Sequence, residues 1–267
     1  MSCTINIAKV RTTGGLKVLY NADHFQQDHL LELLGEDPLQ LFSDAELICE
    51  TGNARSYRLP LDDHHVFAKI YKPRKWHRNM INRIDPACFA AFKAGIRLYC
   101  ADTPTPLPLF AVAGHTPSSQ GFCQILCTQF CNNTQTLDQA IREAKPALRN
   151  IIFSELAYLL AEFHGKGFYS NHLRSANILV REKKDGSRAY WFIDLDRMKY
   201  VFGFNSHVFI RTVSRALFEF FDELPADQQQ YLLQQCFNAG LKQNIFKRPS
   251  DIDGFLKRVQ AQIRARR

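Results

Sequence analysis

The residues of this sequence that can do chemistry are concentrated between positions 167 and 197. The run from His172 to Asn177 ends on an amide side chain, and Asp194 follows a second apolar run, residues 191–193. Amide and carboxylate oxygens are hard ligands that suit Mg²⁺, and phosphoryl transfer needs such an ion held between nucleotide phosphates. The spacing therefore predicts a metal site to which Asn177 and Asp194 contribute from opposite ends of one hairpin.

Two elements must position this segment. Residues 178–180 and 190–193 are short apolar runs that flank the turn residues 184–186, and this pattern predicts a β-hairpin. A strongly apolar helix is expected to end at residues 164–167, directly before the chemical segment. His164 is expected to cap or pack this helix end.

Further elements are expected upstream. Residues 66–71 alternate in the manner of a strand that carries Lys69 on one face, and His64 and His65 look like turn residues before it. Residues 85–100 carry apolar side chains at helical spacing. The proline-rich run 103–108 forbids a longer helix.

The order of these pieces resembles the protein-kinase-like fold and, more narrowly, the Kdo/WaaP family of bacterial lipopolysaccharide kinases with its toluene-tolerance-type relatives. The family patterns HxxG, D-L-x-x-x-N-I-L and I-D-x-x-R look like residues 164–167, 172–179 and 193–197. Residues 66–69 look like the lysine strand of this fold. The individual motifs are short, and their order and spacing carry the resemblance, which spans roughly residues 50 to 220.

The resemblance implies an α+β, two-lobed protein-kinase-like fold. It also implies an ATP- and Mg²⁺-dependent phosphotransferase that acts on a sugar hydroxyl of the lipopolysaccharide inner core. In this reading Lys69 holds the α- and β-phosphates of ATP, and Asn177 and Asp194 hold the metal. Arg174 contacts the transferred phosphoryl group, and His172 orients or deprotonates the acceptor.

His172 is the main departure from the family pattern, because it stands where the family carries its catalytic aspartate. A neutral imidazole also accepts a proton near pH 7, so the substitution is compatible with a base. A loop histidine that is hydrogen-bonded to backbone is the competing interpretation. The corresponding alternative function is a catalytically impaired pseudokinase that serves as a nucleotide-binding or scaffolding regulator of envelope biogenesis.

Two more departures concern the nucleotide. Residues 86–100 contain no acidic residue, and Lys93 stands near the place of the family's glutamate, so Lys69 is expected to lack its usual partner. No three-glycine phosphate loop is present. In its place, the backbone N–H groups of Gly52 and Asn53 are expected to face phosphate from a tight turn.

Simpler interpretations stay open for several of these residues. Lys69 alone is most often a solvent-facing strand lysine, and Arg174 is equally a plain surface arginine. Asp196 and Arg197 form a structural ion pair in one interpretation, and Arg197 orients the loop in the other.

The formal net charge of +8 and the pI near 9.1 predict attraction to polyanions. The excess lies in the run 72–83 and in the tail 257–267, each of which is either a solvated face or a contact with an anionic membrane. The expected partner is a lipopolysaccharide core or another lipid-linked sugar. No nucleic acid is expected, because no stacking-aromatic pattern accompanies the basic residues.

Eight cysteines without paired CxxC spacing argue against a zinc site and indicate small buried groups in a reducing compartment. No apolar run approaches the roughly 20 residues that span a bilayer, and no signal-like segment opens the sequence. These features predict a cytoplasmic protein, with peripheral attachment to the inner membrane left open.

The domain division follows from where strand patterns give way to helical ones. Residues 1–131 are expected to form an N-lobe of small strands, with irregular structure over residues 1–60 and the helix at 85–100. Residues 132–267 are expected to form a helical C-lobe that holds the hairpin segment 167–197.

Overall fold

A computed structural model of the chain describes residues 4–62, 64–72, 85–118, 122–170, 172–200 and 205–266, without the side chain of Asp196. The chain divides into two compact units, residues 1–132 with 194–196, and residues 133–193 with 197–267. Residues 194–196, which the sequence predicts as part of the C-lobe, belong to the first unit. Residues 73–83 of the basic run lie outside the described residues.

The described part of the first unit is built on one antiparallel sheet with the strand order β1-β2-β6-β7-β5-β4-β3. Its strands are β1 (Ile7–Arg11), β2 (Lys17–Asn21), β3 (Glu46–Glu50), β4 (Ala54–Leu61), β5 (His64–Tyr71), β6 (Pro108–His115) and β7 (Phe122–Gln129). The strand predicted at residues 66–71 is confirmed. The turn predicted for His64 and His65 is wrong: both residues lie in β5 and pair with β4, because Asp62, with φ of 49°, belongs to the turn that precedes them.

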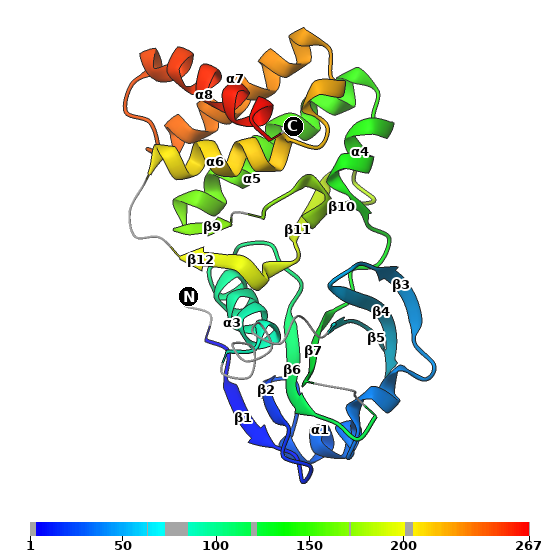
Figure 1. Cartoon of the computed structure of the whole chain (residues 1–267). Helices are drawn as coiled ribbons and strands as arrows, with labels where there is room; N and C mark the ends of the chain where they lie inside the picture. The colour runs from blue at the N-terminus through cyan, green and yellow to red at the C-terminus, as the bar shows by residue number, and fades with distance from the viewer. Residues whose placement is uncertain are drawn as a thin grey trace. The chain divides into compact units, whose positions relative to one another are not determined.

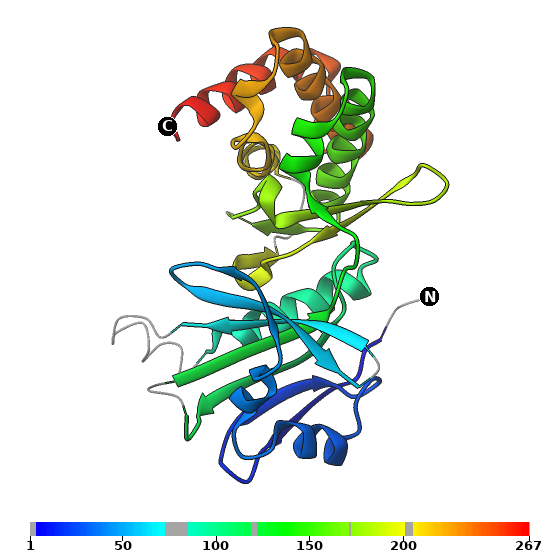
Figure 2. The same cartoon turned by 90° about the vertical axis from the view of Figure 1, so that its right-hand side faces the viewer.

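Helices cover both faces of this sheet, and Figure 2 shows α1 and α3 on opposite sides of it. Helix α1 (Gln27–Leu34), followed by the short helix η1 (Pro38–Phe42), buries Leu30 and Leu34 against one face. Helix α3 (Ala87–Cys100) buries Phe89, Phe92 and Ile96 against the other. The helix expected at 85–100 is thereby confirmed, whereas α1 lies where only strands and irregular structure were predicted.

Gly95 lets α3 approach the sheet closely. A Cβ at this position would lie 2.5 Å from Cγ of Pro108 on β6 and 3.5 Å from Cδ1 of Leu195. Leu195 directly follows Asp194 in the chain. Gly95 is therefore part of what holds the Asp194 segment against α3 and β6.

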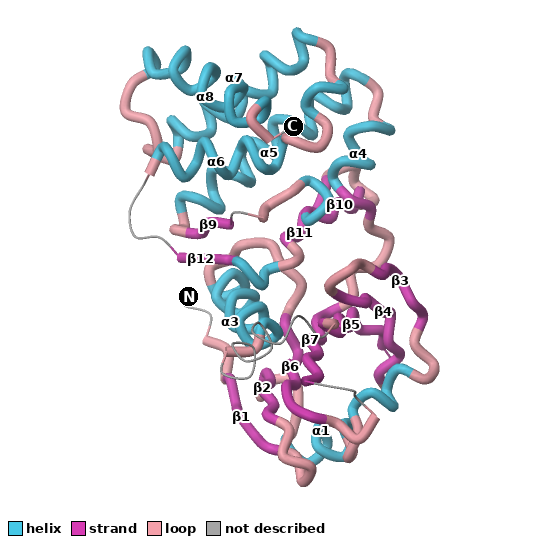
Figure 3. The backbone as a smooth tube through the Cα atoms, viewed as in Figure 1, coloured by secondary structure: helices cyan, strands magenta, loops and turns pink. Residues whose placement is uncertain are grey.

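The second unit is mainly helical, and its helices are the cyan segments labelled α4 to α8 in Figure 3. Its helices are α4 (Leu137–Glu143), α5 (Pro146–Gly165), α6 (Ser206–Leu217), α7 (Ala226–Lys242) and α8 (Ile252–Arg264), with short helices η2 (Ser175–Asn177), η4 (Phe221–Glu223) and η5 (Pro249–Asp251). Helix α5 packs on α7, and α6 packs on α8. Buried phenylalanines fill the space between them, including Phe153, Phe209, Phe237 and Phe255.

The hairpin predicted around residues 184–186 is confirmed as β10 (Ile178–Glu182) and β11 (Arg188–Phe192), and β8 (Gln135–Thr136) pairs with β10. The hairpin is attached to α5 because Arg188 and Tyr190 both donate hydrogen bonds to Glu155. This carboxylate raises the pKa of Arg188, and burial together with Glu155 raises the pKa of Tyr190. Strand β9 (Phe168–Ser170) pairs with β12 (Met198–Tyr200), and the turn η3 (Leu195–Arg197) precedes β12.

Within the described part of the chain, no helix has the length and apolar character needed to cross a membrane. The thiols of Cys88, Cys123, Cys127 and Cys236 are buried. Burial raises the pKa of Cys123 and of Cys236 to about 12. These four thiols stay protonated at neutral pH and act as small apolar groups. The expectation of buried cysteines is wrong for Cys49, which is exposed, and for Cys100 and Cys131, which are only half-buried.

Gly95→Ala should destabilise the protein by about 1–3 kcal/mol, since the added methyl group has to displace Pro108 or the helix itself. Gly254→Ala is the matched control, because it also lies in a helix but meets nothing within 4 Å. It should be neutral or stabilising by up to about 1 kcal/mol. Thermal melting of the two variants compares them, and equal melting temperatures would contradict a packing role for Gly95.

Candidate functional site

In the first unit, the ammonium group of Lys69 contacts the carboxylate of Asp194, a residue 125 positions further along the chain. Lys69 lies on the face of β5 that also carries Tyr71, which packs with α3. Its side chain is only 17% exposed, and its amine lies 5.0 Å from the centre of the Tyr71 ring. The structure thus places Lys69 in a partly buried position rather than on an open strand face.

Helix α3 contains no acidic residue, as the sequence showed, so Asp194 provides the carboxylate that Lys69 contacts. Asp194 has φ of 59°, in the left-handed region. Among residues with a Cβ, aspartate and asparagine tolerate this region best, and such backbone conformations cluster at functional sites. The turn at Asp194 directs its carboxylate toward β5.

Gly52 and Asn53 form the tip of the β3–β4 hairpin, next to the end of β5. The carbonyl of Asn53 accepts a hydrogen bond from the backbone N–H of Lys72, the residue that directly follows β5. The prediction that the Asn53 N–H faces phosphate requires correction, because this group donates to Oγ1 of Thr51 within the turn. A Cβ on Gly52 would meet nothing within 4 Å, so that residue is open to a ligand.

Glu50 links residues around the same turn through hydrogen bonds. Its carboxylate accepts hydrogen bonds from Lys72 at 2.6 Å and from Arg55 at 3.0 Å. These two cations hold the pKa of Glu50 below its usual range.

In the second unit, the loop from His172 to Asn177 is held by its own hydrogen bonds. The side-chain amide of Asn177 donates to the backbone carbonyl of His172 at 3.0 Å, and the backbone N–H of Asn177 bonds the carbonyl of Arg174. Because the Asn177 nitrogen is used in this way, the amide oxygen is the group left to act as a ligand. The carbonyl of Asn177 accepts from the N–H of Ile193, the residue that directly precedes Asp194.

The imidazole of His172 lies against Arg197, with Nη1 of Arg197 2.6 Å from Nε2 of His172. A guanidinium group has only donors, so Nε2 is the acceptor of this hydrogen bond. This contact supports the interpretation in which Arg197 orients the loop. It also occupies the lone pair that His172 would use as a base.

Glu219 lies beyond the end of α6 and binds the same loop, although no pattern in the sequence predicts this. It accepts hydrogen bonds from Oγ of Ser175 at 2.8 Å and from the backbone N–H of Ala176 at 3.2 Å. Its second oxygen lies 3.5 Å from Arg174, whose side chain is 55% exposed. No spacing pattern in the sequence connects Glu219 to this loop, because only the folded second unit brings it there.

The comparisons with known proteins agree with this arrangement. The model of the lipopolysaccharide kinase (Kdo/WaaP) family matches residues 50–202, which is more than half of the chain. The chain belongs to this family. A solved structure, WaaP in complex with acyl carrier protein, matches with a TM-score of 0.59 and 15% sequence identity over 90% of this chain and 97% of that one. No curated protein matches.

These matches confirm the kinase-like fold and the α+β class that the sequence predicted. Membership in the lipopolysaccharide kinase (Kdo/WaaP) family assigns the chain a lipopolysaccharide kinase function, which is phosphoryl transfer. The matched segment contains Lys69, His172, Asn177 and Asp194, whereas Glu219 lies beyond it.

The residues present fit a magnesium nucleotide. A partly buried lysine suits phosphate oxygens, and the aspartate beside it suits a divalent cation. Among the residues described, no group of three or more His, Cys, Asp or Glu side chains gathers as a metal site. A nucleotide-bound Mg²⁺ does not need such a group, since the phosphates and water complete its coordination.

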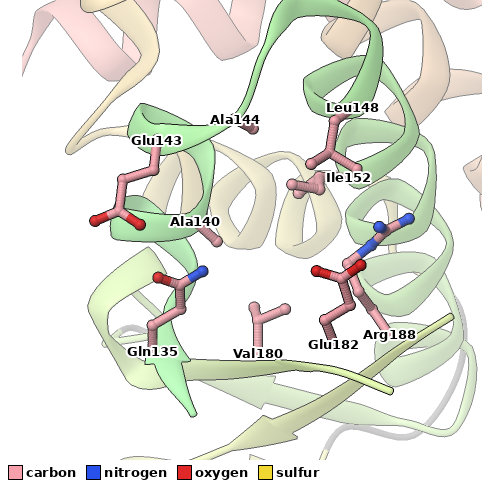
Figure 4. A pocket seen from close by; sticks show the side chains of 9 residues that line it. All are labelled: Gln135, Ala140, Glu143, Ala144, Leu148, Ile152, Val180, Glu182 and Arg188. Carbon is pink, nitrogen blue, oxygen red and sulfur yellow. The ribbon is translucent and has the colours of Figure 1, made fainter. Parts of the chain in front are cut away.

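A separate pocket lies in the second unit between α4, α5 and β10 (Figure 4). Ile152 and Val180 contribute apolar surface, and Glu143 and Glu182 stand on its rim. It contains none of the candidate site residues. We assign it no role in the chemistry.

Glu219→Ala should loosen the loop and destabilise the protein by about 1–3 kcal/mol, because it leaves the buried Ser175 hydroxyl and the Ala176 N–H without their acceptor. Glu223→Ala is the matched control, because that side chain is 55% exposed and, among the described residues, forms its ion pair with Arg142 on the surface. Hydrogen exchange over residues 172–177 should accelerate in the first variant alone. Unchanged exchange in both would contradict the role of Glu219.

Proposed function

We propose that this protein is an ATP- and Mg²⁺-dependent phosphotransferase that phosphorylates a sugar hydroxyl of the lipopolysaccharide inner core at the cytoplasmic face of the inner membrane. The contact between Lys69 and Asp194 is the observation that carries the proposal. It pairs a lysine on a sheet strand with the aspartate of the family's I-D-x-x-R pattern, and no acid on α3 competes for that lysine.

The proposed roles follow from the chemistry of each side chain. Lys69 binds the α- and β-phosphates, while Asp194 and the amide oxygen of Asn177 are ligands of Mg²⁺. The metal neutralises charge on the phosphates during transfer. Arg174 is a cation held loosely by Glu219, so it is available to the transferred phosphoryl group.

His172 orients the acceptor hydroxyl or takes its proton. A base needs a ring nitrogen with a free lone pair, and Nε2 is the ring nitrogen that faces Arg197. The hydrogen bond from Arg197 occupies Nε2, and this observation favours the second candidate function. In that candidate, His172 and Arg197 hold an inactive loop, and the protein is a pseudokinase that binds nucleotide or acts as a scaffold in envelope biogenesis.

Mg·ATP should raise the melting temperature of the protein, because a ligand at a hundred times its dissociation constant adds about 2.7 kcal/mol to the stability of the folded state. Lys69→Met should lose most of this shift, whereas Lys93→Met on α3 should retain it as a control of equal charge change. No stabilisation of the wild-type protein at millimolar Mg·ATP would rule out the nucleotide site.

Phosphate incorporation into lipopolysaccharide separates the two candidate functions. Asp194→Asn should reduce the rate at least about 100-fold, since the metal ligand loses its charge. His172→Gln is the informative variant, because its amide oxygen can accept the bond from Arg197 but cannot take a proton. If His172 is the base, both His172→Gln and His172→Ala lose about 100-fold or more.

Two other outcomes of this assay would change the role proposed for His172 or for the whole protein. Activity that survives in His172→Gln and falls in His172→Ala would make His172 a positioning residue. A wild-type protein that binds Mg·ATP and incorporates no phosphate would be the pseudokinase.

A further inference from the structure

Three arginines of the second unit meet where α6 and α8 pack together. Arg211 and Arg215 lie one helical turn apart on α6, the first exposed and the second half-buried. Arg266 follows the C-terminal end of α8, which packs along α6 (Figure 1). None of the three takes part in the site described above.

The position of Arg266 follows from where α8 ends. The buried face of this helix carries Phe255, Val259 and Ile263, each spaced by four residues and almost fully buried. Arg266 lies in the turn that follows α8, where its backbone N–H donates a hydrogen bond to the carbonyl of Ile263. The Arg266 residue is half-buried, and the Nη1 atom of its guanidinium is fully buried with no hydrogen-bond partner.

The electrostatics of the cluster are unfavourable as it stands. Burial lowers the pKa of Arg266, and the positive charges of Arg215 and Arg211 lower it further. Like charges one turn apart on a helix also repel each other. Among the side chains that the structure describes, no carboxylate lies within salt-bridge distance of any of the three.

Three other arginines of this unit have carboxylate partners: Arg142 is bound by Glu223 and Asp138, Arg188 by Glu155, and Arg174 lies near Glu219. Arg258 and Arg264 on α8 have no carboxylate partner among the described side chains, but both are exposed. The cluster differs from them because Nη1 of Arg266 is buried without a partner and lies near two further positive charges. A buried N–H donor amid three positive charges has the character of a site for an anion.

We propose that Arg211, Arg215 and Arg266 form a binding site for a phosphate group, carried either by a lipid headgroup or by a soluble phosphate compound. The guanidinium fork matches phosphate oxygens in two-point hydrogen bonds. A phosphate monoester brings close to two negative charges, which suits three cations better than the single charge of a carboxylate. The inference stands independently of the proposed phosphoryl transfer.

The experiment uses the full-length protein and two double variants with equal charge change. Arg211→Gln/Arg215→Gln removes the α6 half of the cluster. Lys257→Gln/Arg258→Gln removes two exposed charges of α8 and is the control. Melting temperatures are measured in inorganic phosphate and in chloride of equal ionic strength.

Phosphate should raise the melting temperature of the wild type and of the control, and the Arg211→Gln/Arg215→Gln protein should lose at least about half of that rise. In chloride, this variant should be as stable as the wild type or more so, because a repulsion has been relieved. That second readout separates loss of a site from loss of folding. Equal phosphate shifts in all three proteins would overturn the proposal.

Sedimentation with vesicles identifies the source of the phosphate. If vesicles that contain phosphatidic acid, whose phosphate is a monoester, bind the wild type and the control but not the Arg211→Gln/Arg215→Gln variant, and phosphatidylcholine vesicles bind none of the three, the group is a lipid headgroup. If the variant loses its shift with inorganic phosphate and the vesicles bind all three proteins equally, the group belongs to a soluble phosphate compound. If both double variants lose vesicle binding equally and all three proteins show equal phosphate shifts, the three arginines contribute only general surface charge and the proposal is wrong.

Discussion

The contact between Lys69 and Asp194 is the interaction on which the rest of the first unit's chemistry depends. It joins the middle of a seven-stranded sheet to a segment far along the chain, and it provides for Lys69 the carboxylate that α3 lacks. The left-handed turn at Asp194 and the close packing at Gly95 both serve to hold this segment in place. On binding a magnesium nucleotide, each partner would exchange the other for a stronger opposite charge, Lys69 for phosphate and Asp194 for the metal.

The loop of the second unit is held differently, because its geometry is fixed by hydrogen bonds within the loop and to the side chains of Arg197 and Glu219. Asn177 is fixed by the His172 carbonyl, His172 by Arg197, and the loop backbone by Glu219. The hydrogen bond that Arg197 donates to His172 is charge-assisted, because the guanidinium is a cation. Position 172 therefore presents an imidazole, and not the negative charge of the family's aspartate, to an acceptor.

Much of the fold was predictable from local patterns. The alternation at residues 66–71, the helical spacing at 85–100 and the turn at 184–186 each determine a short element by themselves, and the structure confirms all three. Helix α1 was missed although Leu30, Leu34 and the following Gly35 carry a helical signal, because short polar stretches around it suggested irregular structure. His64 and His65 were placed in a turn because polar residues there hide the start of β5.

The site was less predictable because its contacts join distant residues. The sequence shows that α3 carries no acidic residue. That Asp194 provides the carboxylate for Lys69 instead depends on the packing of the whole first unit. No motif in the sequence indicates the contacts of Glu219 or the buried Nη1 atom of Arg266. Such residues act through tertiary position, and only the folded chain shows which groups they meet.

A structure of the protein with Mg²⁺ and a non-hydrolysable ATP analogue tests the central claim most directly. The account predicts that the amine of Lys69 leaves Asp194 and lies within hydrogen-bond distance of the α- or β-phosphate oxygens, while the Asp194 carboxylate coordinates the metal. A bound nucleotide that touches neither residue, with Lys69 and Asp194 still paired to each other, would contradict it.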